Sequence, residues 1–159
     1  MPPKVAAPQI RLQNATACLT ATAAPLEILA NTLKAPFLEA MSNTTQSLLE
    51  CIQTVKQNKN DCTQLIEQTH QLLHAIIVVH IKSDTGGELP PNMLNQIGKF
   101  TETLHKIHTF VEAQQSGSKV KNFFRQGEMS MLLKHCKAEL QEGLDFFQVG
   151  HLFFNAAQE

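Results

Sequence analysis

Residues 61–115 have the sequence DCTQLIEQTHQLLHAIIVVHIKSDTGGELPPNMLNQIGKFTETLHKIHTFVEAQQ, in which two long apolar patterns flank the polar turn SDTGGELPP at 83–91. In the second pattern, apolar residues recur at alternating steps of four and three, which is the spacing of a helical seam that another helix must cover. This seam consists of Met93, Ile97, Phe100, Leu104, Ile107 and Val111. The first pattern is wider, as in a helix contacted from more than one side. The stretch therefore predicts a helical hairpin on which the rest of the chain packs.

The segments before the hairpin also have helical periods. Four leucines recur every seven residues, at Leu12, Leu19, Leu26 and Leu33. Pro25 interrupts this pattern, and because proline cannot donate to the preceding turn, a kink or break is expected near 22–25. Pro36 is expected to begin a second helix that extends to about residue 56. Its apolar face would consist of Phe37, Met41, Leu48, Ile52 and Val55.

The boundaries of the two hairpin helices are marked by capping and breaking residues. Asn60 or Asp61 is expected to cap the third helix, since both can accept hydrogen bonds from its first free N–H groups. That helix should end near Lys82. Either Pro90 or Pro91 should begin the fourth helix, because proline suits a first helical position.

After the hairpin, Ser118 is placed to cap a short basic segment at 119–126, and Gly127 should interrupt the chain again. A fifth helix is expected to follow, weakened by about 1 kcal/mol at Gly143 relative to alanine. Its apolar stripe would consist of Met129, Leu133, Cys136, Leu140, Leu144 and Phe147.

These patterns predict an all-α fold, because every long apolar pattern has the helical period and none alternates as a strand does. The expected architecture is a four-helix bundle with an additional C-terminal brace segment and a fifth helix. The length of 159 residues suits a single domain spanning 1–159, with a disordered lead-in at 1–8 and a core at about 9–148.

Composition and charge exclude several classes of function. The longest apolar run, at 75–79, is far shorter than the roughly 20 residues of a membrane-spanning helix. No apolar region of the signal-peptide type is present near the start, which favours a cytoplasmic protein. The net charge is −1 with interleaved signs, and both Trp and Tyr are absent, so no nucleic-acid partner is expected.

No residue pattern indicates catalysis. The four cysteines, Cys18, Cys51, Cys62 and Cys136, form no CxxC pair and are expected to be reduced and buried on helical stripes. His70 and His74 are spaced as half a metal site, as are His105 and His108, but HExxH is missing and no matching carboxylates recur. Neither a nucleophile with an oxyanion turn nor a phosphate-binding loop is present. We therefore expect a non-enzymatic protein with no catalytic residues, metal or cofactor.

The segment KVKNFFR at 119–125 is the main candidate for a binding site. Lys119, Lys121 and Arg125 are interleaved with Phe123 and Phe124. Such a stretch can lie at an anionic lipid surface, where each cation contributes about 1 kcal/mol. Alternatively, the two phenylalanines plug the end of the bundle while the cations are merely solvated.

The order of these parts resembles the N-terminal helical-bundle domain of mixed-lineage kinase domain-like protein and the related fungal HeLo-type cell-death domains. The local matches are KQNKNDC at 56–62 leading into Leu65 and His74, then 110–112, and Phe123 with Phe124 after it. The similarity extends over about 15–147.

This resemblance implies a cell-death or signalling module that associates with itself and engages anionic phospholipids through basic residues, with recruitment to the plasma membrane. It also implies a kinase-like or nucleotide-binding signalling partner. The chain would then be a free-standing effector, a decoy or adaptor, or an excised fragment. A helical protein–protein interaction module without lipid binding is the alternative, and a ligand-binding bundle is the third.

Overall fold

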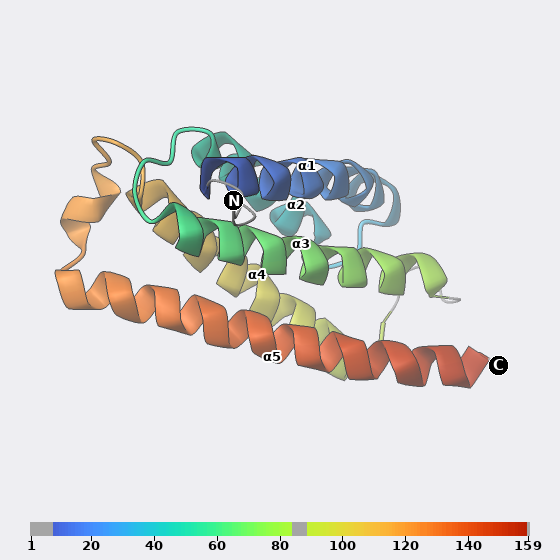
Figure 1. Ribbon diagram of the computed structural model, residues 1–159. Helices are drawn as coiled ribbons and strands as arrows, with labels where there is room; N and C mark the ends of the chain where they lie inside the picture. The colour runs from blue at the N-terminus through green and yellow to red at the C-terminus, as the bar shows by residue number, and fades with distance from the viewer. Residues whose placement is uncertain (1–7, 84–88, 159) are drawn as a thin grey trace, which may run out of the picture.

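The computed structural model describes residues 8–83 and 89–158, which form five α-helices and one short 3₁₀ helix (Figure 1). The elements are α1 (Pro8–Leu33), α2 (Leu38–Ile52), α3 (Lys59–Lys82), α4 (Pro91–Ala113), η1 (Val120–Phe123) and α5 (Gln126–Gln158). The described residues contain no strand, and a single isolated bridge joins Val55 to Gln115. The prediction of an all-helical fold is confirmed.

The helices are stacked in layers. α1 and α2 pack against each other, with α1 lying on α3 and α2 lying on α4. On the other side of the hairpin, α5 runs along the molecule and contacts both α3 and α4 (Figure 1). α3 and α4 therefore lie between the α1–α2 layer and α5, and they contact each other much less than each contacts these neighbours.

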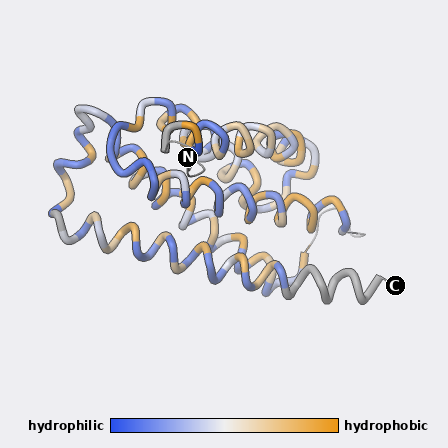
Figure 2. Tube along the Cα trace, in the orientation of Figure 1, coloured by the Kyte–Doolittle hydropathy of each residue, from blue (hydrophilic) through white to orange (hydrophobic). Residues whose placement is uncertain are grey.

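The core follows the apolar patterns of the hairpin. Apolar and polar residues alternate along the helices (Figure 2), as expected where each helix buries one face. All six seam residues of α4 are buried, and the wider face of α3 is buried through Cys62, Leu65, Ile66, Leu72, Leu73, Ile76 and Val79. These residues belong to one hydrophobic cluster to which all five α-helices contribute.

The helix α1 continues through Pro25, so the expected break does not occur. Proline removes one backbone hydrogen bond, but fully buried leucines on both sides, Leu19 and Leu26, anchor the helix in the core. Thr22, one turn before Pro25, also contacts α3 through a 2.7 Å hydrogen bond between its Oγ1 and Nδ1 of His70. Tertiary packing thus outweighs the local cost of the proline.

The sequence predicted that α2 begins at Pro36, but the helix begins at Leu38. Phe37 adopts a left-handed conformation (φ 72°) and is 42% exposed, so it does not join the buried face of α2. Its ring lies over Gly98 of α4, where an added Cβ would lie 3.0 Å from the ring. The glycine in α4 thus makes room for a phenylalanine in the turn before α2.

The cap predicted for α3, Asn60 or Asp61, is also wrong, because both residues lie inside the helix. The helix begins at Lys59 after Asn58, which has a left-handed backbone (φ 52°) and whose side chain makes no capping bond. Instead, the Asn58 amide donates to Oε1 of Gln114 at 2.7 Å. Asp61 pairs with Lys137 of α5 at 3.1 Å, which joins two helices that are distant in sequence.

The starts of η1 and α5 also differ from prediction. Lys119, not Ser118, precedes η1, which has no side-chain cap, and α5 begins at Gln126 and runs through Gly127. Four residues of the predicted α5 stripe are buried, whereas Met129 and Leu133 are partly buried against the core.

The ends of the hairpin helices agree with prediction, since α3 ends at Lys82 and α4 begins at Pro91. Pro8 begins α1 instead of belonging to a lead-in. The rest of that lead-in, 1–7, and the centre of the hairpin turn, 84–88, lie outside the described residues.

Candidate functional site

The three predicted lipid-binding cations lie together at one end of the bundle, on η1 and its flanks (Figure 1). Lys119, Lys121 and Arg125 are all exposed. Nζ of Lys121 donates to Oε1 of Gln57 at 3.0 Å, which connects η1 to the segment between α2 and α3. The side chain of Arg125 is 93% exposed and lies 3.9 Å from Glu128, a surface pair that contributes little to stability.

The two phenylalanines of this segment have different environments. Phe123 is 83% exposed, whereas Phe124 is partly buried against the end of the bundle. A 3₁₀ turn followed by extended backbone at Phe124 directs the two side chains differently. The side chain of Phe124 is therefore docked against the bundle, whereas that of Phe123 is exposed.

Phe124 lines an open pocket of about 680 Å³ between η1, the start of α5 and the segment that leads into α3. Two cations, Lys121 and Arg125, share this lining with side-chain amides. The lining comprises Gln57, Asn58, Gln114, Lys121, Asn122, Phe124, Arg125, Met129 and Ser130. Cations and amide N–H groups donate hydrogen bonds, so the chemistry of this pocket suits an anionic group such as phosphate.

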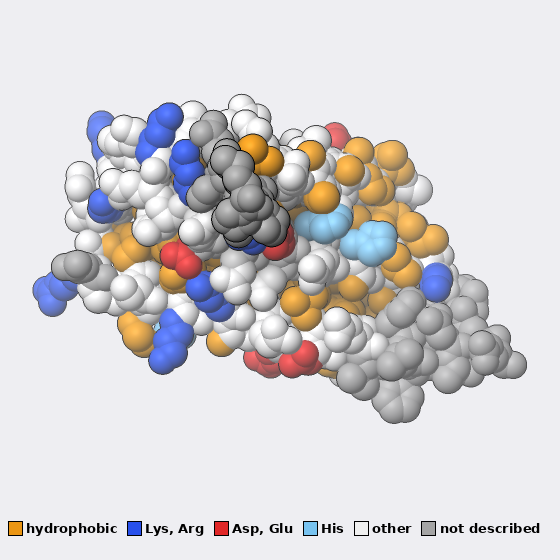
Figure 3. Space-filling view, in the orientation of Figure 1, with side chains coloured by type: hydrophobic (Ala, Val, Ile, Leu, Met, Phe, Trp, Pro, Cys, Tyr) orange, Lys and Arg blue, Asp and Glu red, His pale blue; other side chains and the backbone are white. Residues whose placement is uncertain are grey.

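Other basic residues surround this segment. Lys56, Lys59 and Lys134 lie at or next to the same end of the helices. Figure 3 shows Lys and Arg side chains gathered over the part of the molecule that carries η1 and the first turns of α3 and α5. We call the exposed residues Lys119, Lys121, Phe123 and Arg125 the basic tip.

The first histidine pair lies on α3, where His70 is partly buried against α1 and His74 is exposed. The rings of His70 and His74 are 6.4 Å apart between centroids and tilted by 36°. Burial lowers the pKa of His70, as does the neighbouring His74, while Thr22 occupies Nδ1 of His70. This arrangement favours a neutral imidazole that contributes to helix packing.

The second pair, His105 and His108 on α4, faces α2. Nδ1 of His105 lies 3.5 Å from Oγ1 of Thr44. Nε2 of His108 lies 3.3 Å from Sγ of Cys51 and 3.8 Å from Oε2 of Glu112. The sequence shows the i, i+4 spacing of His108 and Glu112 but did not predict this group, because Cys51 joins it only through the packing of α4 on α2.

The four thiols are free and have different environments. Burial raises the pKa of Cys62 and of Cys136 to about 12, so both act as small apolar residues. Cys18 is exposed, which corrects the expectation that it is buried. The pKa of Cys51 is raised by partial burial and by the nearby carboxylates of Glu112 and Glu50.

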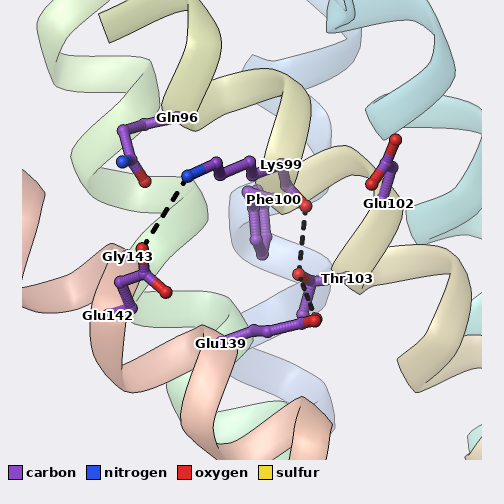
Figure 4. Close-up of a pocket in the computed structure, with 8 residues that line it drawn as sticks. All are labelled: Gln96, Lys99, Phe100, Glu102, Thr103, Glu139, Glu142 and Gly143. Carbon is purple, nitrogen blue, oxygen red and sulfur yellow. Dashed lines mark hydrogen bonds and ion pairs between the residues drawn. The ribbon is translucent and has the colours of Figure 1, made fainter. Parts of the chain in front are cut away.

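A second pocket, of about 300 Å³, lies between α4 and α5 and contains a polar clamp (Figure 4). Oγ1 of Thr103 donates to Glu139 at 2.8 Å, and Nζ of Lys106 donates to the same carboxylate at 2.7 Å. Burial alone would raise the pKa of Glu139, but these hydrogen bonds outweigh it and hold the pKa below its usual value. Lys99 approaches Glu142 at 3.9 Å across the same pocket. The arrangement joins α5 to α4.

No protein-family model, curated protein or solved structure matches this chain. None of the helices in the described parts of the chain has the length and apolar character of a membrane-spanning segment.

Proposed function

We propose that this protein is a non-enzymatic signalling module that binds anionic phospholipid surfaces through its basic tip. The observation that carries the proposal is Phe123, which is 83% exposed. An exposed phenylalanine on a short helix, flanked by exposed cations, supplies both an apolar group for the acyl boundary and charges for the headgroups. The adjoining 680 Å³ pocket offers Lys121 and Arg125 to a headgroup phosphate.

The expected strength of this contact follows from its parts. Three cations contribute about 1 kcal/mol each near an anionic surface, and burial of one phenylalanine contributes about 2 kcal/mol. A sum of about 5 kcal/mol corresponds to a Kd of about 0.2 mM, which is weak binding for one copy. Several copies held together would bind much more tightly, because each further contact becomes intramolecular.

Weak binding by one copy gives self-association a physical role, and self-association is also what the resemblance to HeLo-type domains implies. In this proposal, α1–α4 are the four-helix bundle, η1 is the brace segment and α5 is the additional fifth helix. Within a cell-death or signalling pathway, a kinase-like or nucleotide-binding partner would control the exposure or clustering of the basic tip.

Vesicle flotation tests the proposal. Recovery with vesicles containing phosphatidylserine or phosphoinositide should exceed recovery with pure phosphatidylcholine vesicles, and it should fall with salt, because screening acts beyond about 8–10 Å at physiological ionic strength. The variant Lys119→Glu/Lys121→Glu/Arg125→Glu should lose most of the binding while keeping its helical circular dichroism, since all three side chains are exposed.

The matched control is Lys34→Glu/Lys82→Glu/Lys99→Glu, which changes the net charge equally at exposed positions away from the basic tip. This control should retain a larger share of the binding than the tip variant. Equal, negligible recovery with both vesicle types would overturn the lipid proposal in favour of a protein–protein interaction module, which predicts no lipid preference.

A further inference from the structure

Three potential metal ligands converge between the last turn of α2 and the C-terminal half of α4. They are Sγ of Cys51, Nε2 of His108 and a carboxylate oxygen of Glu112, and all three atoms lie within 4.8 Å of one another. His108 and Glu112 are one helical turn apart, so α4 presents both on one face. Cys51 completes the group from the neighbouring helix.

The distances in this group agree with ligands around one metal ion. Zinc lies about 2.3 Å from a thiolate sulfur and about 2.0–2.1 Å from an imidazole nitrogen, which separates these two ligand atoms by about 3.5 Å in a tetrahedral site. The observed separation of Sγ of Cys51 from Nε2 of His108 is 3.3 Å, and that of Nε2 from Oε2 of Glu112 is 3.8 Å. Shifts of a few tenths of an ångström would give coordination geometry.

A nucleophilic cysteine fits this geometry less well. In a catalytic triad, the acidic residue contacts one imidazole nitrogen and the nucleophile contacts the other. Here both Cys51 and Glu112 approach the same nitrogen of His108.

The backbone around the group is held by contacts that do not involve the three ligands' own side chains. Nε2 of Gln115 donates to the carbonyl of Cys51 at 3.3 Å and also to Thr54. Just beyond α2, the amides of Lys56 and Gln57 both donate to the carbonyl of Gln114, at 3.0 and 3.2 Å. The ends of α2 and α4 are thus joined in a fixed register, which positions Cys51 opposite His108 before any ion binds.

We propose that Cys51, His108 and Glu112 form a binding site for Zn²⁺. One thiolate, one imidazole and one carboxylate make a donor set that suits this borderline-soft ion. The side chain of His108 is 25% exposed and that of Glu112 is 38% exposed, so solvent reaches the group. Three protein ligands leave a fourth position for water or for a donor from a bound molecule. The sequence did not predict this site, because HExxH is missing and Cys51 is distant from His108 along the chain.

Titration of the reduced protein with Zn²⁺ against a chromophoric zinc indicator tests the assignment. The unaltered protein should bind one ion tightly, and Cys51→Ser or His108→Gln should weaken that binding by about 100-fold or more, beyond the loss typical of residues that only orient ligands. Matched controls are Cys18→Ser, which removes an exposed thiol, and His105→Gln, which removes the neighbouring imidazole on α4. Both should bind Zn²⁺ as the unaltered protein does.

Binding of Co²⁺ in place of Zn²⁺ gives a spectroscopic signal that reports directly whether the thiolate of Cys51 is a ligand. A thiolate bound to Co²⁺ produces an intense near-ultraviolet charge-transfer band, which should be present in the unaltered protein and absent from Cys51→Ser. Circular dichroism of each variant verifies that it is folded. Equal Zn²⁺ affinity in the unaltered protein and folded Cys51→Ser, or loss of binding in His74→Gln instead, would overturn the proposal and assign the ion to another site.

Discussion

At the scale of single residues, His80 is a buried histidine with one ring nitrogen that is unpaired in the described part of the chain. It is 3% exposed, and its Nδ1 lies 2.8 Å from the carbonyl of Ile76, which places the proton on Nδ1. Nε2 then finds no hydrogen-bond partner among the described residues. A buried polar atom without a partner costs about 1–3 kcal/mol of stability.

Burial lowers the pKa of His80, although the hydrogen bond to Ile76 acts in the opposite direction. The folded protein therefore takes up a proton on His80 less readily than the unfolded chain, whose histidine pKa is about 6.5. As the pH falls below about 6.5, protonation of the unfolded chain reduces stability, and the loss continues until the pH passes the lower pKa of the folded state. Above about 6.5 this residue contributes no pH dependence.

Replacement of His80 by leucine should therefore stabilise the protein. His80→Leu should raise the free energy of unfolding by about 1 kcal/mol at pH 7.5, because it removes an unpaired buried nitrogen. The gain should be larger at pH 5.5, where the unaltered protein also loses stability to protonation of the unfolded chain. Urea denaturation at the two pH values measures both effects, with His74→Leu as the exposed control; a loss of stability at both pH values would contradict the assignment.

At the scale of elements, the contact between α3 and α5 depends on a missing side chain. A Cβ on Gly143 would lie 2.8 Å from Cδ2 of Leu72, which is fully buried in α3. Glycine weakens an isolated helix, but here it allows two helices to approach closely. The sequence showed only the cost of this glycine, because the neighbouring leucine is far away along the chain.

Gly143→Ala should consequently destabilise the protein by about 1 kcal/mol, although alanine favours a helix by about the same amount. The reason is that Leu72 must move within a packed core to admit the new methyl group. Chemical denaturation measures the change, and the control is Gly127→Ala in the same helix, where an added Cβ meets nothing within 4 Å. A rise in stability for Gly143→Ala would show that Leu72 moves at little cost.

At the scale of the whole molecule, the proposed lipid contact determines how the bundle is oriented at a membrane. The basic tip would face the lipid, whereas Ile28, which is 65% exposed in the last third of α1, lies away from η1. The chain contains neither Trp nor Tyr, so one introduced tryptophan reports on its own position without background.

Phe123→Trp should therefore show a blue shift of its emission with anionic vesicles, and brominated lipids should quench it, because the indole enters the interface. Ile28→Trp should show neither change. A blue shift at residue 28 and none at residue 123 would mean that another face of the protein meets the lipid.

The sequence by itself determined the elements of this fold. Helical period, the α4 seam and proline placement depend on residues close together in the chain, so they predicted the hairpin, the end of α3 at Lys82 and the start of α4 at Pro91. Charge is equally local, which is why the cations of 119–125 were visible as a candidate binding segment.

Only the tertiary structure decided what depends on contacts between helices. The ring of Phe37 packs over Gly98, and the side-chain amide of Asn58 donates a hydrogen bond to Gln114, at two helix starts that differ from the predicted ones. The exposure of Phe123 was likewise decided by the tertiary structure. The pairing of Cys51 with His108 joins residues 57 positions apart. Such pairs arise from the packing of one helix on another, and that packing is set by the whole core and by no single segment.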